Sequence, residues 1–577
     1  IAGTEPHTHE GAARRMTTST PVQGARRRLR ASPRATFWVT FLAMFITIGG
    51  WSITNPAMAS PDEPAHAVKA AATVRGQFVA DESEYNAGRG TFEVPELFAQ
   101  VWNITCFAFQ PDTTPNCAAK LSGDLDAPSE SASHVARYNP VYYAIIGLPS
   151  LLPSSAETLT LMRLMSALLN AFLIALVART VMELRRPNWP IVGVVAAMTP
   201  MTIYIASSMT PQGPEIFGAL LTLVVLLALT REPDEQLLSR RMWRLVIGAA
   251  FFVATRGLSP AYLAFIVVLV LLVTPRLGVV WDLIRTRRIW PQLGLCIAVS
   301  VGAVVYTLAS GSLALGIVLP EPGLTASQVV DRMLDNTDYY LEQLLGVFGW
   351  GDTHLAIWTQ MLIVSVVAVV VVVGAAMATW RERAAIVIVM IATIVVPIGV
   401  QLISFRESGL VWQGKYVLPI AMAAPVIAGF FAERRPMSNA TSSKVVPLAF
   451  ALAALAQVIG FAVNTHRYVN GASGPWTSLI EGAWLPPVNM WLMLALQVVA
   501  WGGLAVLVFL SVHRSDEMPG FELEPGVPTY PGATVPTPSS AEPAPTADRR
   551  VPDETVNPTA HESESATVPV AASRSDR

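Results

Sequence analysis

The sequence has few charged residues and few lysines for its length. Of 577 residues only 14% are charged, whereas 52% are hydrophobic, and lysine occurs only as Lys69, Lys120, Lys415 and Lys444. A chain this apolar cannot cover its surface with polar groups, so a water-soluble globule is excluded and a polytopic membrane protein is predicted. The formal net charge of −2 offers no basic surface, and we expect no nucleic-acid partner.

Nucleotide and zinc motifs are also missing. The chain has no Walker loop, no Rossmann glycine triad and no Cys/His spacing of the zinc type, so neither an ATP-driven nor a metal-thiolate mechanism is supported. Of the three cysteines, Cys106 and Cys117 share one long polar segment, while Cys296 is isolated in an apolar run. In an oxidising compartment the first two favour a disulfide, and the alternative is two unpaired thiols.

What the chain does contain is a series of apolar runs of membrane-spanning length. They predict an all-α fold of about twelve transmembrane helices. The pair around Arg256 is short, and its break is either an external turn or a re-entrant bend. The runs lie at residues 37–56, 159–183, 189–208, 213–230, 244–258, 259–275, 291–310, 355–376, 384–403, 416–432, 445–464 and 489–511.

Arginine clusters predict the orientation of these helices. They fall in alternate loops, as the positive-inside rule requires if both termini are cytoplasmic. The clusters are at residues 26–30, 185–186, 240–244, 285–288, 381–383 and 434–435. Large external loops then lie at residues 57–158, with interfacial helices, and at 311–354. We predict a multi-pass protein of the cytoplasmic membrane, with a membrane domain over residues 37–511.

The two ends of the chain have no packable apolar pattern. Residues 1–36 form a basic arm, which we expect to be disordered and cytoplasmic, and whose first fifteen residues need not belong to the native protein. Residues 512–577 are rich in Pro, Ser, Thr and acidic residues and predict a disordered cytoplasmic tail.

A charge cluster, Ser60 to His66, directly follows the first apolar run. Ser60 and Glu63 match an S-x-x-E capping box, which gives Glu63 a structural role, although Pro64 can delay the helix start. Asp62, His66 and Lys69 are spaced to share one helical face, where a carboxylate base or an anion site can form. A plain cap and a functional cluster are both consistent with these residues.

Three later segments carry polar or aromatic residues at membrane boundaries. Tyr142 and Tyr143 lead an apolar run too short to span, which predicts an interfacial helix anchored by the tyrosines. Asp352 stands in Gly349-Trp350-Gly351-Asp352-Thr353, and Gln413, Lys415 and Tyr416 stand just before another span. Lys415, Arg163 and Arg256 are cations on the predicted external side, where they bind an anion or merely snorkel.

The order of these motifs resembles a bacterial family of predicted membrane proteins, domain of unknown function 2142. The resemblance covers roughly residues 37–510 and rests on four motifs: Asp62-Glu63-Pro64-Ala65-His66, Asn139-Pro140-Val141-Tyr142-Tyr143, Gly349 to Thr353, and Gln413-Gly414-Lys415-Tyr416-Val417-Leu418-Pro419. Two departures are Lys415, where family members usually have Arg, and Thr210 to Glu215, where they have an N-P-D-like turn. A lysine keeps the charge but loses the bidentate grip of arginine.

That family in turn resembles the C-class glycosyltransferases, which use polyprenyl-phosphate sugars outside the cytoplasmic membrane. The resemblance implies an inverting transfer of sugar to an envelope glycan or lipid, with Asp62 as general base, assisted by Glu63, in an environment that raises its pKa. Donor binding would then involve His66, Lys69, Tyr142, Tyr143, Arg163, Arg256, Asp352, Gln413, Lys415 and Tyr416.

Other readings of the sequence stay open. No cofactor is required, but Asp62, Glu63 and Asp352 leave room for a divalent cation. A transporter or flippase would need ionisable residues deep in the spans, and a non-catalytic envelope scaffold would leave Asp62, Lys415 and Asp352 far apart. The sugar, the acceptor, the lipid length and the oligomeric state are not readable from the sequence.

Overall fold

The computed structural model describes residues 32–78, 80–82, 89–312, 321, 323–433, 439–476 and 481–512. Contacts divide the chain into two units, Ile1–Ala533 and Thr534–Arg577, and every described residue belongs to the first. The arginines at 26–30 and 434–435, most of the predicted N-terminal arm and nearly all of the predicted tail lie outside the described residues.

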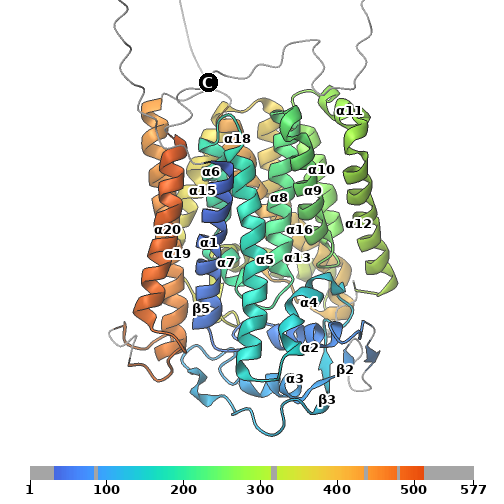
Figure 1. Ribbon diagram of the computed structural model, residues 1–577, viewed down its shortest axis with the longest axis vertical. Coiled ribbons are helices and arrows are strands. Elements are labelled where there is room, and N and C mark those ends of the chain that lie inside the picture. The colour runs from blue at the N-terminus through green and yellow to red at the C-terminus, as the bar shows by residue number, and fades with distance from the viewer. Residues whose placement is uncertain are drawn as a thin grey trace, which may run out of the picture. The chain divides into compact units, whose positions relative to one another are not determined.

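The described residues form a bundle of long apolar helices (Figure 1), which confirms the predicted all-α, multi-span class. Nine helical stretches in this part of the chain are long and apolar enough to cross a membrane. They comprise α1 (Pro33–Thr54), α5 (Ala156–Met182), α8 (Gln212–Arg231), η4 (Arg287–Ile289) with α12 (Trp290–Ala309), α15 (Ile357–Met377), α16 (Trp380–Ser408), η5 (Gly414–Val417) with α17 (Leu418–Ala421) and α18 (Ala423–Ala432), α19 (Asn439–Asn470) and α20 (Met490–Val512).

The predicted count of twelve spans is not confirmed. A tenth crossing is present if α6 (Asn188–Ala197) and α7 (Pro200–Ala206), bent by 66°, form one span. The remaining two runs are helical as α9 (Glu235–Val253) and α10 (Ser259–Val273). However, α9 begins with several arginines, and α10, at about 22 Å for 15 residues, is shorter than a bilayer core of about 30 Å.

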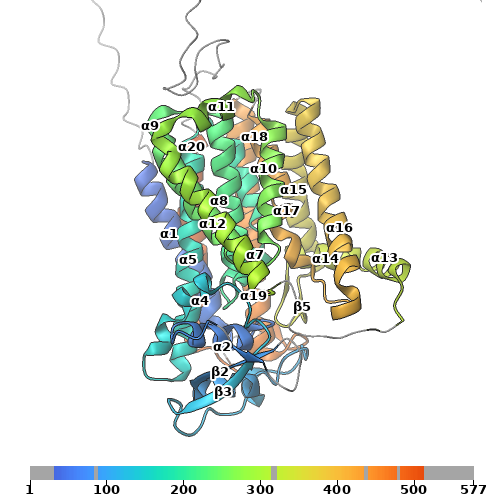
Figure 2. The same ribbon diagram turned by 90° about the vertical axis from the view of Figure 1, so that its right-hand side faces the viewer.

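The two ends of the bundle differ in what they carry. The start of α1 and the end of α20 lie at one end, and the elements of the long polar loop lie at the other, here called the loop end (Figures 1 and 2). The loop contains α2 (Glu63–Thr73), α3 (Glu96–Gln100), η1 (Val101–Ile104), η2 (Pro115–Cys117), α4 (Pro140–Ile146) and η3 (Leu148–Leu151).

A small antiparallel sheet, absent from the sequence prediction, supports α2 at the loop end. Its order is β1 (Asp81–Glu82), β2 (Gly90–Pro95) and β3 (Pro128–Ser133), with β2 and β3 paired from Gly90↔Ser133 to Pro95↔Pro128. Phe92 and Val94 of β2 share a buried apolar cluster with Ala65 and Val68 of the alanine-rich α2. Burial of this shared apolar face holds α2 against the sheet.

The remaining elements complete the other loops. The helix α11 (Gly278–Arg285) lies at the end of the bundle away from α2, as Figure 1 shows. The second long loop contains α13 (Ala326–Asp335), α14 (Thr337–Leu345) and a short hairpin of β4 (Val347–Phe348) and β5 (Thr353–His354). The hairpin brings the Gly349 to Thr353 motif into a tight turn.

Candidate functional site

The Asp62 turn has a backbone conformation that a helix cap does not require. Asp62 has φ +64°, in the left-handed region, and its side chain makes no capping bond to α2. The Glu63 carboxylate instead accepts from the Ser60 amide at 3.3 Å, so Glu63 takes the structural role that the sequence suggested. A left-handed residue other than glycine costs about 1–3 kcal/mol unless its surroundings enforce it.

Side chains from distant parts of the chain hold the segment before this turn. Tyr204 and Tyr468 both donate from their hydroxyls to the Ala59 carbonyl, at 2.9 and 3.0 Å. Trp350 Nε1 donates to the Met58 carbonyl at 3.0 Å. The Asp62 turn is therefore positioned by α7, α19 and the Gly349 to Thr353 turn together.

Asp62 opens into a cavity of about 460 Å³ at the loop end of the bundle. The lining comes from α2, the segment after β3, the start of α8, the α9–α10 turn and the segment before α17. Its described ionisable and amide-bearing side chains are Asp62, His66, His134, Tyr138, Gln212, Arg256, Gln413, Lys415 and Tyr416. Among the described lining residues, one carboxylate therefore shares the cavity with an arginine and a lysine.

His134 is a hydrogen-bonding partner of Asp62 and helps to lower its pKa. Its Nε2 lies 3.2 Å from Asp62 Oδ1, and the Asp62 side chain is 36% exposed. Burial alone would raise the pKa of Asp62, but the hydrogen bond with His134 and the positive charge of Lys415 outweigh it, and the pKa lies below its ordinary value. The expectation of a raised pKa was therefore wrong, because the sequence did not reveal His134.

His66 lines the cavity as a neutral ring. Its Nδ1 lies 2.8 Å from the Tyr143 hydroxyl, and the two rings stack with centroids 5.9 Å apart. Burial lowers the pKa of His66 to about 3, so the imidazole carries no charge near neutral pH. Tyr143 supports His66 from behind and does not line the cavity.

The two cations are arranged around one aromatic ring. The Arg256 guanidinium lies 4.2 Å from the centre of the Tyr416 ring, and Lys415 Nζ lies 5.9 Å from it. Arg256 also faces the buried Glu215 at 3.8 Å, beyond hydrogen-bond distance. Stacking on an aromatic face fixes a cation while leaving its N–H groups free to bind an anion.

The segment before α17 needs its glycine. The Gly414 amide donates to Gln343, and a Cβ at Gly414 would collide with the Tyr340 backbone carbonyl. Gln212 donates from its side chain to the Lys415 carbonyl at 2.6 Å, which joins the start of α8 to this segment. These contacts explain why Lys415 points into the cavity with Gln413 and Tyr416.

Two of the predicted site residues are buried together outside the cavity. Arg163 Nε and Nη2 donate to Glu63 Oε1 and Oε2 at 2.7 and 2.6 Å, and Nη1 donates to the Asn55 carbonyl at 3.0 Å. Glu63 also accepts from the Met209 amide at 3.0 Å. These bonds occupy both side chains. The structure therefore gives Glu63 and Arg163 a structural role, in place of the predicted roles in catalysis and in binding a substrate anion.

Lys69 and Tyr142 also lie away from the cavity. Lys69 Nζ lies 5.0 Å from the Phe92 ring centre and donates to the Phe78 carbonyl at 3.4 Å, while the Tyr142 hydroxyl bonds Ser166 at 3.0 Å. Of the three residues predicted to share one face of the helix, Asp62 and His66 line the cavity and Lys69 does not.

The predicted aromatic anchor also differs from the structure. Tyr142 and Tyr143 are fully buried, and the exposed apolar residues of this segment are Val141, Leu148, Leu151 and Leu152. Because α4 packs on α2, its two tyrosines are buried, whereas the leucines of η3 and Leu152 after it are exposed.

Asp352 has a structural partner instead of a place in the cavity. Its Oδ2 accepts from Arg467 Nη2 at 3.0 Å, and Oδ1 accepts from the Thr353 hydroxyl at 3.0 Å. Within the described part of the chain, no three His, Cys, Asp or Glu side chains converge as metal ligands. The oxygen set suggested for a divalent cation therefore does not assemble, since Glu63 and Asp352 are each paired with arginine.

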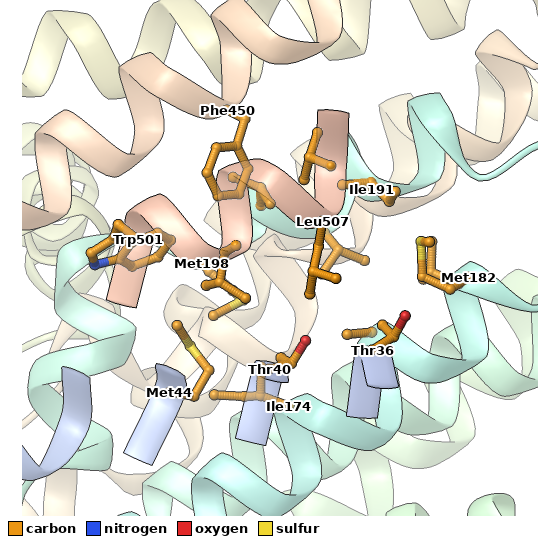
Figure 3. A pocket seen from close by; sticks show the side chains of 16 residues that line it. Thr36, Thr40, Met44, Ile174, Met182, Ile191, Met198, Phe450, Trp501 and Leu507 are labelled. Carbon is orange, nitrogen blue, oxygen red and sulfur yellow. The ribbon is translucent and has the colours of Figure 1, made fainter. Parts of the chain in front are cut away.

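A second cavity, of about 80 Å³, lies between α1, α5, α6, α19 and α20 (Figure 3). Met44, Ile174, Phe450 and Trp501 are among its lining side chains, and no ionisable side chain lines it. Its described lining offers no group for acid–base chemistry, in contrast to the loop-end cavity.

The fold and the cavity define a multi-span helical membrane protein with an ionisable site at one end of its bundle. A family model described as predicted membrane protein (DUF2142) matches residues 45–424, and the chain belongs to this family. The match includes all the ionisable residues of the loop-end cavity.

Comparisons with other proteins add little. No curated protein matches the chain. Among solved structures the chain is similar to a crystal structure of ArnT from Cupriavidus metallidurans bound to undecaprenyl phosphate. The identity is 15% over 84% of this chain and 78% of that chain, with a TM-score of 0.37.

Proposed function

We propose that this protein is a glycosyltransferase that moves a sugar from a polyprenyl-phosphate donor to a cell-envelope acceptor. The observation that carries the proposal is the meeting of Asp62 with Arg256 and Lys415 in one cavity at the loop end. A carboxylate facing two cations suits a reaction that removes a proton on one side and releases a phosphate on the other. The motif resemblance to the C-class glycosyltransferases points to the same reaction.

In the proposed reaction the acceptor hydroxyl attacks the anomeric carbon with inversion. The bond from that carbon to the phosphate oxygen breaks, the hydroxyl proton passes to Asp62, and the lipid phosphate leaves with its charge facing Arg256 and Lys415. The low pKa of Asp62 keeps it ionised before substrate binds. A bound phosphate brings negative charge beside it, which raises the pKa and restores its strength as a base.

The proposed location is the cytoplasmic membrane, with both termini inside and the loop-end cavity outside. One support is that the arginine clusters fall in alternate loops of the sequence. Another is that the start of α1 and the end of α20 lie at the same end of the bundle (Figure 1). A site at the end of the bundle, instead of ionisable residues at mid-depth, favours interfacial chemistry over transport.

The test is radiolabelled sugar transfer from defined polyprenyl-phosphate sugars in membranes that contain the protein. Asp62→Asn should abolish transfer with normal insertion, because asparagine fits the left-handed backbone but cannot take a proton. Asp124→Asn is the matched control, since Asp124 is an exposed carboxylate of the same loop. A wild-type rate in Asp62→Asn would contradict the assignment of the base.

A second set of variants tests whether Lys415 binds the donor phosphate. Lys415→Ala should weaken binding of farnesyl phosphate by roughly tenfold or more, and Lys415→Arg should retain most of it, because charge at this position is what the phosphate needs. Equal binding by wild type and Lys415→Ala would show that Lys415 only fills the cavity wall.

A further inference from the structure

One exposed aromatic side chain stands at the rim of the loop-end cavity. Phe109 lines the cavity and is nevertheless 70% exposed. Its φ is +59°, a left-handed conformation that glycine adopts without strain and phenylalanine does not. Neither burial nor backbone preference explains a phenylalanine here, and such strained positions cluster at ligand contacts.

The loop that carries Phe109 is held firmly in place. Cys106 and Cys117 form a disulfide across it, the pairing that the sequence favoured. The Arg467 guanidinium, on α19, donates to the carbonyls of Phe107, Gln110 and Thr113 at 2.9, 2.8 and 2.8 Å. The same guanidinium is paired with Asp352. The loop is therefore built to present its tip in one position.

A second aromatic ring, that of Trp350, supports Phe109. Trp350 packs edge-to-face against it, with centroids 5.3 Å apart at 66°. The indole N–H of Trp350 holds Met58, four residues before Asp62. The Phe109 ring and the proposed base are thus parts of one connected framework, joined through the Gly349 to Thr353 turn.

The surroundings of the ring define the ligand chemistry. Gln413, Thr210 and Tyr138 offer hydrogen-bonding groups to the same cavity. The exposed neighbours Gln110, Asp112 and Asn116 make the loop water-facing, so a ligand meeting Phe109 arrives from water and not from the lipid. A sugar ring has this character, with an apolar C–H face for the aromatic ring and hydroxyls for the polar wall.

We propose that Phe109 is a stacking platform for a sugar ring of the acceptor, set at the rim of the cavity by the Cys106–Cys117 loop. The inference rests on the proposed function and extends it, since it makes the acceptor a water-exposed carbohydrate and gives it a subsite separate from Arg256 and Lys415. No role for Phe109 follows from the transfer mechanism itself.

The experiment measures sugar binding without any donor or transfer. Purified full-length protein in nanodiscs is probed by saturation-transfer NMR with methyl glucopyranoside, methyl mannopyranoside, methyl galactopyranoside and methyl arabinofuranoside. Saturation of ring C–H protons is expected for at least one of them. Phe109→Ala should weaken that binding about fivefold, and Phe109→Tyr, which keeps the ring, should preserve it.

Two controls separate stacking from damage to the fold. Phe78→Ala removes another half-exposed phenylalanine that does not line the cavity, and should bind the glycosides like wild type. Phe109→Gly should lose binding without a lower unfolding temperature, because glycine relieves the left-handed strain.

Several outcomes would overturn the platform. They are the absence of glycoside binding in the wild type, wild-type binding in Phe109→Ala, or a loss in Phe109→Tyr as large as in Phe109→Ala. Weaker binding of farnesyl phosphate instead of glycosides would place the ring on the donor lipid and also reject the inference. Glycoside binding at Phe109 in a protein that transfers no sugar would refute the proposed function alone.

Discussion

Glu63→Gln and Arg163→Met are expected to destabilise the protein strongly while leaving the cavity lining intact. The two side chains form a bidentate pair, with N–O distances of 2.7 and 2.6 Å, and neither is more than 3% exposed. Neither residue lines the loop-end cavity. Removing one partner strands a buried charge on the other, and that charge has no water to solvate it.

The expected magnitude follows from this burial. Breaking one partner of a buried, hydrogen-bonded ion pair costs about 3–5 kcal/mol of unfolding free energy. Arg332→Met is the control, because its contact with Glu321 is equally short at 2.7 Å but both side chains are about half exposed. An exposed pair of this kind contributes roughly 0.2–1 kcal/mol, so the control should unfold nearly like wild type.

The assay is equilibrium unfolding in mixed detergent–SDS micelles, followed by tryptophan fluorescence. The double variant Glu63→Gln/Arg163→Met should lose less free energy than the sum of the single variants, since it leaves no unpaired charge. The reasoning is refuted if Arg163→Met unfolds like wild type and yet binds farnesyl phosphate more weakly, because Arg163 would then act on the substrate.

Further predictions concern four other positions. Thr36→Val should raise the unfolding free energy by about 1 kcal/mol in the same assay, because the Thr36 hydroxyl is buried with no hydrogen-bond partner among the described residues; a loss of stability would contradict this. Gly414→Ala should lower it by about 1–3 kcal/mol through collision with Tyr340, and unchanged stability would show that the segment can shift. The kcat/KM for transfer, which reports Asp62 in the unliganded protein, should persist from pH 7 to pH 5, since the pKa of Asp62 is lowered there and activity is lost only as pH falls through that value. His134→Ala should move this acid limb upward, toward the ordinary aspartate pKa of about 4, and an unmoved limb would exclude His134 as the cause.

Local sequence patterns predicted the elements well but the residue roles less well. Apolar run length located each spanning helix, because a bilayer demands about 20 apolar residues whatever the tertiary packing. The S-x-x-E pattern correctly predicted a bond from the Ser60 amide to Glu63, but not the capping box itself, because α2 begins at Glu63 with Asp62 at its N-cap. The small sheet was missed, because β2 and β3 are short and pair across more than thirty residues of polar chain.

His134 shows why part of the site was invisible. It stands in the polar loop with no motif of its own, one of eight histidines, and only the fold brings it to Asp62. The one sequence feature that could have pointed to His134 is its position four residues before Tyr138, in the segment that leads to the Tyr142 motif. For Glu63 and Arg163 the sequence misled in the opposite way. Their charges suggested a role in the reaction or in substrate binding, but in the structure they form a buried ion pair with each other outside the cavity.

The sequence by itself determined that this is a multi-span helical membrane protein with charged motifs gathered in loops, because hydrophobicity and helix length are properties of short segments. The tertiary structure alone decided which charges share a cavity. Four regions of the chain contribute the cavity residues Asp62, His134, Arg256 and Lys415. Three other charged residues instead contact structural partners outside the cavity: Glu63, Lys69 and Asp352. Charges interact through distance in space, and for residues hundreds of positions apart only packing sets that distance.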